Sequence, residues 1–373
     1  MQRVGRRRKS ARTLLLATVW LAAMLPACAA RLVTVEQLEQ LLVQQTLAHK
    51  SDGSTANALR GLELTERLTP TSLARIVNSR SPGRQSAEEL KLLVMKSSLL
   101  APPQSELPRQ PMPDSASLQA LWNAANHFQA VTLRHLPDFL ATRVTHNYDN
   151  IPMNPNPVFW KSATMHLDGS SSQEITYRNG AEVPTQPEAK PKQANRVTGL
   201  YSKGEFGPIL TTVMLDLVKG RMTWGRWEQA ATGPAVVFYY AVPEASSHFK
   251  VKFSCCVEDE RFGRDAEIIA FDGAPAYHGE ITVDPATGNV LRVTFVPELH
   301  LDSSDARSGI AVDYGQVTIG EKSFNCPVQS VAILSIQPNR GPETMQARSE
   351  WINQVDFVNY HRFGATVKLR VGP

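Results

Sequence analysis

ITVDPATGNVLRVTF, residues 281–295, decides the fold class of this chain. Apolar and polar residues alternate up to the turn-forming segment 284–289, and the alternation resumes after it at Leu291, Val293 and Phe295. A period of two is typical of a β-strand with one buried face, and turn residues between two such runs predict a hairpin. The stretch therefore predicts antiparallel β-structure.

The same alternation recurs on both sides of this hairpin. Leu140, Val144 and Tyr148 share one parity, with polar residues between them. We expect a second hairpin at residues 320–322 and a last strand at residues 365–371. The C-terminal part of the chain is therefore expected to be a single antiparallel sheet.

One strand of this sheet is apolar on both parities. Residues 236–242, VVFYYAV, have no polar side, so we expect cover on both faces. The cover is expected to be a helix at 207–215, where proline occupies the first helical position.

Another strand changes parity within its length. In residues 310–319 the apolar positions are Ile310, Val312 and Tyr314, and then the odd-numbered positions after Gly315. A β-bulge at this glycine is the simplest cause, and bulges curve sheets. The sheet is therefore expected to curve and to form a concave surface.

Residues 30–100 show a helical pattern instead. Capping-box sequences begin at Thr34 and Ser86, and Thr69-Pro70 is typical of an N-cap followed by the first helical residue. Four short amphipathic helices are predicted, the last over residues 86–100. Their apolar stripes are, in order, Leu38, Leu41, Leu42 and Leu47; Leu59, Leu62, Leu64 and Leu68; Leu73, Ile76 and Val77; and Leu90, Leu93, Val94 and Leu99.

The expected domain organisation is a signal peptide at 1–29, a helical segment at 30–100, a linker at 101–114 and an antiparallel β domain with helices at 115–373. The linker, APPQSELPRQPMPD, contains five prolines, which oppose both helix and sheet and predict an extended segment. Residues 115–135 are predicted to form one more helix. The fold class is α+β: short N-terminal helices followed by a curved antiparallel sheet, an open half-barrel covered by helices.

The first 29 residues are typical of an export signal. Six basic residues precede an apolar run at 13–25 that is too short for a permanent membrane span. Two interpretations of LPACAA, residues 25–30, stay open. Either a peptidase cuts after Ala29, or it cuts before Cys28, which then carries lipid as in bacterial lipoproteins. We expect an exported protein, periplasmic or associated with the outer membrane.

Removal of the signal changes the charge balance. The whole chain has 39 basic and 35 acidic residues, and residues 1–29 contain six of the basic ones and none of the acidic ones. The mature balance of 33 against 35 gives a net charge of −2, so nucleic acid is not an expected partner. Membrane contact is expected only through a lipid on Cys28.

The remaining cysteines are few. Cys255, Cys256 and Cys326 allow at most one internal disulfide. Adjacent residues of a strand point to opposite faces, so Cys326 can reach only one of the other two. A bridge from Cys326 and buried free thiols are both open alternatives, and no metal motif is present.

Four segments carry a resemblance to a known family. They are LPDFLAT at 136–142, GEFG at 204–207, AYHGEITVD at 276–284 followed by Thr287-Gly288, and VDYG at 312–315. In these segments the chain resembles a family of secreted acidobacterial proteins of unknown function, over residues 34–373. The expected architecture is also similar to the lipoprotein-carrier fold, a half-barrel whose concave face shelters acyl chains, although fold-level likeness does not establish function.

No sequence motif indicates catalysis, and we expect no cofactor. The nucleophile elbow, the zinc-protease motif and the phosphate loop are missing from the sequence. The carboxylate of Glu205 at the turn 204–207 and a calcium site at 302–305, beside His300, are hypotheses, and an ordinary turn explains each better. We expect no catalytic residue and no metal site.

Aromatic residues supply the candidate ligand-binding positions. Trp224 and Trp227 have opposite parity in an expected strand, so one is expected to face the core and the other the concave side, although core packing of both is the simpler interpretation. Phe238 and Tyr240, from the strand at 236–242, complete the candidate set.

Three functions remain open from the sequence. The first is an interaction or structural module of the cell envelope, in which the helical segment docks an envelope protein. The second is a binder or carrier of an apolar, acyl-chain ligand in the half-barrel cavity, bound by burial of methylenes. The third, a hydrolase with a site assembled from distant residues, requires a histidine, a carboxylate and a serine or a metal to converge in one cleft.

Overall fold

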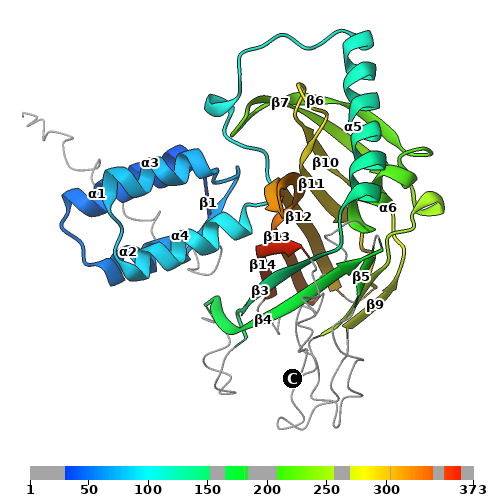
Figure 1. Cartoon of the computed structure of the whole chain (residues 1–373). Helices are drawn as coiled ribbons and strands as arrows, with labels where there is room; N and C mark the ends of the chain where they lie inside the picture. Colours follow the sequence, from blue (N-terminus) through cyan, green and yellow to red (C-terminus); the bar gives the residue numbers. More distant parts are fainter. Residues whose placement is uncertain are drawn as a thin grey trace, which may run out of the picture.

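The computed structural model of the chain describes residues 30–151, 164–179, 181–183, 208–255, 269–302, 304–338 and 348–362. Six α-helices and a curved, open sheet of ten antiparallel strands form the described part (Figure 1). The expected α+β class is confirmed.

The strand order of the large sheet is β5-β4-β3-β14-β13-β12-β11-β10-β7-β6, and every neighbouring pair is antiparallel. The strands are β3 (Phe139–Asp149), β4 (His166–Arg178), β5 (Ala181–Val183), β6 (Arg221–Ala230), β7 (Gly233–Val242), β10 (Tyr277–Val283), β11 (Val290–Pro297), β12 (Ser304–Ile319), β13 (Lys322–Pro338) and β14 (Ser349–Arg362). Two shorter strands, β8 (Val251–Cys255) and β9 (Ile269–Gly273), pair separately.

The hairpin predicted from residues 281–295 is present between β10 and β11. The amide of Asp284 donates to the carbonyl of Asn289, and Gly288 has a φ of 75°. A side chain at Gly288 would be strained at this angle and would crowd the backbone of Ala124 in the helix above the turn. The glycine therefore serves both the turn and its contact with the helix.

The second hairpin, between β12 and β13, is also confirmed. Gly320 lies in its two-residue turn with a φ of 68°. The predicted bulge lies close to the expected place, but the extra residue is on the other strand. Pairing shifts between Asp313 and Tyr314, and Val328 of β13 is the residue left without a partner.

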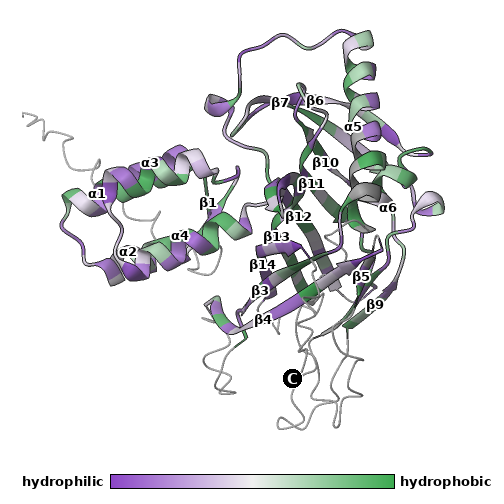
Figure 2. Ribbon diagram, viewed as in Figure 1, coloured by the Kyte–Doolittle hydropathy of each residue, from purple (hydrophilic) through white to green (hydrophobic). Residues whose placement is uncertain are grey.

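Helices cover one face of the sheet, as expected. α5 (Ser115–His135) has the predicted bounds, and α6 (Pro208–Asp216) begins at the predicted proline. In Figure 1 the sheet curves around these two helices. Figure 2 shows that α6 is mostly hydrophobic and that α5 carries both hydrophobic and hydrophilic residues.

The N-terminal segment contains four helices and a small parallel sheet. The helices are α1 (Val35–Leu47), α2 (Asp52–Arg60), α3 (Pro70–Arg80) and α4 (Arg84–Lys96), and the strands are β1 (Arg31–Val33) and β2 (Leu62–Leu64). Thr34 and Thr69 are the expected N-caps of α1 and α3, and both accept from the backbone three residues on. Their leucine-rich faces form one buried cluster.

Two expectations for this segment were wrong. Leu62, Leu64 and Leu68 are not helical, because α2 ends at Arg60 and the alternating Leu-Glu-Leu at 62–64 pairs in parallel with β1. Ser86 is not an N-cap, because α4 begins after Gly83. Asp52 of α2 instead accepts hydrogen bonds from the backbone of Gln85 and Ser86, at 2.8 and 3.1 Å, and caps α4 from outside.

The proline-rich stretch 101–114 contains one short 3₁₀ turn, at Gln104–Glu106, and is otherwise without helix or strand. It is held by contacts with both the helical segment and the large sheet. Pro102 and Pro103 are buried, and the indole of Trp227 donates to the carbonyl of Pro111 at 2.8 Å. Residues 101–114, called the strap below, therefore connect the helical segment to the sheet along a fixed path.

Several expectations concern residues outside the described ranges. They are the signal at 1–29 with Cys28, the turn 204–207, Cys256, and the last strand at 365–371. Among the described helices, none is long and apolar enough to cross a membrane.

Candidate functional site

The two faces of the central strands differ in chemistry. The even-numbered residues of β7, such as Val236 and Phe238, belong to an apolar cluster with α5 and α6. The opposite face carries Arg226, Glu280 and Arg292. One face is therefore an apolar core, and the other holds charges.

The bulge in β6 decides where its tryptophans point. Trp224 pairs with Phe238 and Trp227 pairs with Val236, because the register shifts between Trp224 and Arg226. Both indoles therefore lie on the apolar face, with ring centroids 5.6 Å apart in an edge-to-face arrangement. The expectation that their opposite parity separates them was wrong, and core packing of both is what the structure shows.

The other two candidate ligand-binding residues are also in the core. Phe238 and Tyr240 are buried, and Trp122 of α5 meets the ring of Phe238 edge-on at 5.9 Å. The hydroxyl of Tyr240 donates to the carbonyl of Thr294 at 2.6 Å. The structure thus brings all four aromatic candidates together, but beneath helices.

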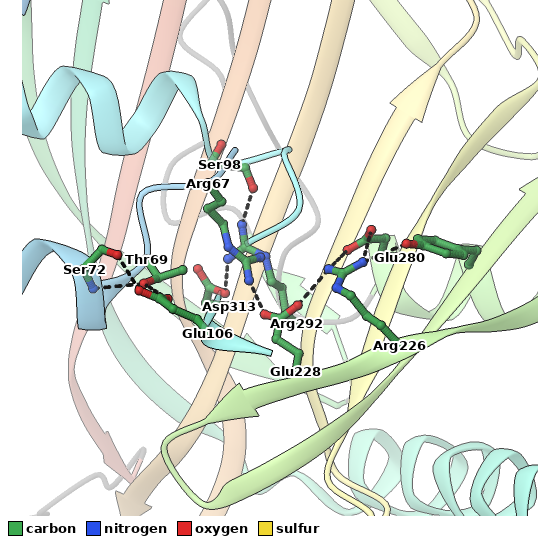
Figure 3. Close-up of polar contacts among 11 residues, drawn as sticks. Arg67, Thr69, Ser72, Ser98, Glu106, Arg226, Glu228, Glu280, Arg292 and Asp313 are labelled. Carbon is green, nitrogen blue, oxygen red and sulfur yellow. Dashed lines mark hydrogen bonds and ion pairs between the residues drawn. The ribbon is translucent and has the colours of Figure 1, made fainter. Parts of the chain in front are cut away.

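The charged face meets the helical segment in a buried network, shown in Figure 3. Arg67, which follows β2, donates to one carboxylate oxygen of Glu228 in β6. Arg226 donates to the other oxygen at 2.7 Å and forms a two-pronged contact with Glu280, with both distances 2.7 Å. The side chains of Arg67 and Glu228 are only 10% and 11% exposed.

A second branch of the network lies beside the first. Arg292 of β11 pairs with Asp313 of β12 and also donates to the carbonyl of Ser98 at 2.6 Å, just after α4. Three guanidinium groups thus face three carboxylates. The network is charge-balanced and has no excess charge to attract an ionic ligand.

The pKa values of the network follow from burial and pairing. Burial alone would raise the pKa of Glu228, but Arg67 and Arg226 outweigh it, and the pKa lies below its ordinary value. Burial opposes the charge of Arg226, yet Glu280 and Glu228 raise its pKa. The pKa of Arg67 is lowered mainly by burial and, to a smaller extent, by repulsion from Arg292.

Glu106 fixes the strap to the same region. Its carboxylate accepts from the hydroxyls of Thr69, at 2.6 Å, and Ser72. Arg75 lies 3.5 Å from it and also pairs with Glu39 at 2.6 Å. The beginning of α3 and the strap are thereby held together.

Apolar and ionic contacts also connect the helical segment to the strands β3, β13 and β14. Leu92 and Met95 of α4 pack with Tyr148, Val331 and Ile352 from three strands. Lys96 pairs with Glu350 at 2.8 Å. Gly309 provides room for Leu99, since a side chain at Gly309 would overlap that leucine.

This arrangement holds the helical segment against the sheet. Every charged group of the network has an opposite charge as its partner, so the carboxylates and guanidiniums face one another. We therefore interpret the network as the joint between the helical segment and the sheet.

A separate polar cluster anchors the end of α6. Asp216 is fully buried and accepts from the hydroxyl of Tyr277 at 2.8 Å, from the amide of His248 at 2.9 Å, and contacts the Nδ1 of His248 at 2.5 Å. The imidazole is 79% exposed. The hydroxyl of the neighbouring residue Ser247 is buried and makes no hydrogen bond.

Cys326 does not form the disulfide considered above. It is a buried free thiol of β13, packed with Phe139, Tyr177 and Phe357. Cys255 lies in β8, in the separate two-stranded sheet. The alternative of a buried thiol is what the structure shows for Cys326.

Within the described residues, no group of histidine, cysteine and acidic side chains could hold a metal ion. The proposed calcium loop at 302–305 is partly a strand, since Ser304 and Asp305 begin β12 and pair with Pro338 and Gln337.

The sequence contained only a weak signal of the network. Arg226 and Glu228 share one parity beside the apolar strand at 236–242, which could have indicated a charged face. Arg67, the partner of Glu228, is 161 positions away from it, and no local pattern predicts that contact.

Fold and site together define an α+β protein in which an open antiparallel sheet is joined to an N-terminal helical segment by buried ion pairs. No known family model matches the sequence, and neither the curated proteins nor the solved structures provide a match. The resemblances to the acidobacterial family and to the lipoprotein-carrier fold stay predictions.

Proposed function

We propose that this protein is an exported structural or interaction module of the cell envelope. Export is supported by the basic and apolar composition of residues 1–29. After export the protein would be periplasmic or associated with the outer membrane, and a lipid on Cys28 would be its membrane contact.

One observation carries the proposal: the chain itself covers the apolar face of its central strands and part of the charged face. Residues of α5 and α6, among them Ala125 and Val213, pack on the apolar face. Arg67 and Ser98 reach the opposite face and pair there with Glu228 and Arg292. Contacts with a partner must then come from the outer surface of an already packed body, which suits a scaffold.

The test is purification of the tagged protein from its native envelope under mild conditions, followed by native mass spectrometry. We expect a stoichiometric protein partner, and the intact mass also gives the N-terminus and any lipid on Cys28. Recovery of the protein alone, with an acyl compound bound in a one-to-one ratio, would contradict the proposal.

A binder of apolar ligands is the second candidate. It is favoured by the shared face of Trp224, Trp227, Phe238 and Tyr240. A ligand there could gain about 0.8 kcal/mol per buried methylene, but α5 or α6 would first have to move away. Solvent extraction of the natively purified protein tests this candidate, since a carrier would release a defined lipid.

A further inference from the structure

The C-terminal end of α6 projects two apolar side chains into solvent. Val218 is 82% exposed, the highest value among the exposed large hydrophobic residues of the described ranges, and Leu215 is 66% exposed. The amide of Val218 donates to the carbonyl of Leu215 at 3.2 Å, and residues three apart in such a turn lie on the same side. The two side chains therefore form one small apolar projection, while their neighbour Leu217 packs against the core.

Basic side chains lie close to this projection. Lys219 and Arg221 follow it in the chain, and Lys250 is two residues from His248, which contacts Asp216 at the end of α6. All three cations are exposed. Within the ranges that the structure describes, none of the three forms an ion pair with a carboxylate. Their charges are therefore available to a ligand.

The acidic residues of the same segments do not balance these cations. Residues 215–221 and 243–250 contain two acidic residues, Asp216 and Glu244. Asp216 is buried and pairs with His248. The exposed carboxylate of Glu244 alone therefore opposes the three cations, which leaves two positive charges in excess.

The parts of the chain outside the described ranges join these elements at their other ends. Residues 184–207 lead into the first residue of α6, and residues 256–268 connect the last residue of β8 with the first of β9. The projection instead follows the last residue of α6, and Lys250 precedes the first residue of β8. The apolar pair and the cations thus belong to described residues alone.

This combination of side chains suits a lipid surface better than a protein partner. Lysine is depleted in protein–protein interfaces, whereas at a membrane its stem packs against lipid and its ammonium group stays at the level of the headgroups. Two side chains on an exposed turn can enter the headgroup region without a complementary pocket, which the central residues of a protein interface require.

We infer that Leu215 and Val218 insert into the surface of an anionic phospholipid membrane, while Lys219, Arg221 and Lys250 contact the lipid phosphates. Apolar burial and attraction to anionic lipids add together in this mode of binding. The inference rests on the envelope location in the proposed function and goes beyond it, because this contact requires no lipid on Cys28.

The test uses the mature protein without an attached lipid, residues 30–373, and two kinds of vesicle. One contains phosphatidylcholine alone, and the other is an equimolar mixture of phosphatidylcholine and phosphatidylglycerol. We expect co-sedimentation to show at least about tenfold tighter binding to the mixed vesicles, because each basic residue near an anionic surface strengthens binding several-fold. Added salt should weaken this binding.

The double substitution Leu215→Ser/Val218→Ser should weaken binding to the mixed vesicles at least about tenfold, because it removes the apolar area that enters the lipid. The matched control is Leu47→Ser/Val77→Ser, since these two side chains are 75% and 42% exposed on the helical segment. The control should bind like the native protein. Circular dichroism should show the same thermal unfolding for native protein and both variants, since all four side chains are exposed.

Three results would overturn the inference: no binding to the mixed vesicles, equal binding to both kinds of vesicle, or equal losses in the two variants. A natively co-purifying protein partner together with no vesicle binding would leave the proposed function standing and remove this inference alone. Vesicle binding that depends on Leu215 and Val218, without any co-purifying protein, would retain the membrane contact and remove the interaction module.

Discussion

Glu228 is central to the joint between the helical segment and the sheet. It accepts from Arg67 in the helical segment and from Arg226 in its own strand, and it is almost completely buried. A buried ion pair adds little net stability compared with apolar packing, but removing one partner leaves an uncompensated charge. Changes at this residue should therefore be costly.

The contribution of Glu228 to the free energy of unfolding should depend on pH. Its pKa is lower in the folded protein than the value of about 4.3 expected when unfolded. Its contribution is therefore fully present above that value and is lost as the pH falls through the folded pKa. We expect Glu228→Gln to lose about 3 kcal/mol at pH 7 and to show a weaker loss of stability between pH 5 and 3.

Urea unfolding at several pH values measures this effect. Asp272→Asn is the matched control, because Asp272 pairs with Lys252 at the surface, and exposed pairs contribute little to stability. Equal effects of the two substitutions would contradict the account of a buried joint.

Cys326 offers a second test with a single residue. Burial raises the pKa of its thiol to about 12, so the thiol is neutral at pH 8 and shielded from reagents. We expect iodoacetamide to label it at least about a hundredfold more slowly in the native than in the unfolded protein. Peptide mapping gives the labelling of each cysteine separately, and a peptide linking Cys326 to Cys255 or Cys256 would show this view to be wrong.

Single residues were the least predictable scale. Thr34 and Thr69 were found as N-caps, because capping depends on the next three residues alone. Asp52, by contrast, caps a helix that begins 32 positions later in the chain, and no local signal could show this.

At the scale of elements, the close spacing of β10 and β11 depends on Gly279. A side chain at Gly279 would overlap the carbonyl oxygen of Thr294, and a backbone atom cannot move aside cheaply. We expect Gly279→Ala to reduce the free energy of unfolding by about 3 kcal/mol or more.

Gly169 is the matched control, because a side chain there would meet nothing within 4 Å. Gly169→Ala should change stability by less than about 0.5 kcal/mol. The prediction fails if thermal denaturation shows equal losses for the two variants.

The anchor of α6 can be tested through local opening. Asp216 connects the end of α6 to Tyr277 of β10 and to His248. Asp216→Ala should speed hydrogen exchange in the last turn of α6, since those bonds hold the helix on the sheet. The exposed substitution Lys252→Ala should leave α6 unchanged, and unaltered exchange in both variants would exclude an anchoring role.

Elements were more predictable than residues, for a physical reason. The bounds of α5 and the two hairpins depend on local periodicity and turn chemistry, which the sequence contains. The prediction that Trp224 and Trp227 lie on opposite faces was wrong. A bulge at Gly225 changes the parity of the strand without any change in the apolar pattern.

At the scale of the whole molecule, the fold class followed from the alternating pattern of residues 140–148 and 281–295. The arrangement of the helical segment against the sheet did not. The helical segment was expected to be followed by an extended proline-rich linker. The structure instead fixes it to the sheet through Arg67, Lys96 and the strap. Such contacts join residues far apart in the chain, and single-sequence patterns do not report them.

The central claim is that the helical segment and the sheet form one interlocked body. Urea unfolding of the mature protein, followed by two signals, tests it most directly. Residues 30–100 contain no tryptophan, so fluorescence reports the sheet domain, while circular dichroism at helical wavelengths also reports the helical segment. We predict coincident transitions for the native chain and an earlier loss of the helical signal in Arg67→Met. Loss of the helical signal in a separate, earlier step in the native chain would contradict the claim.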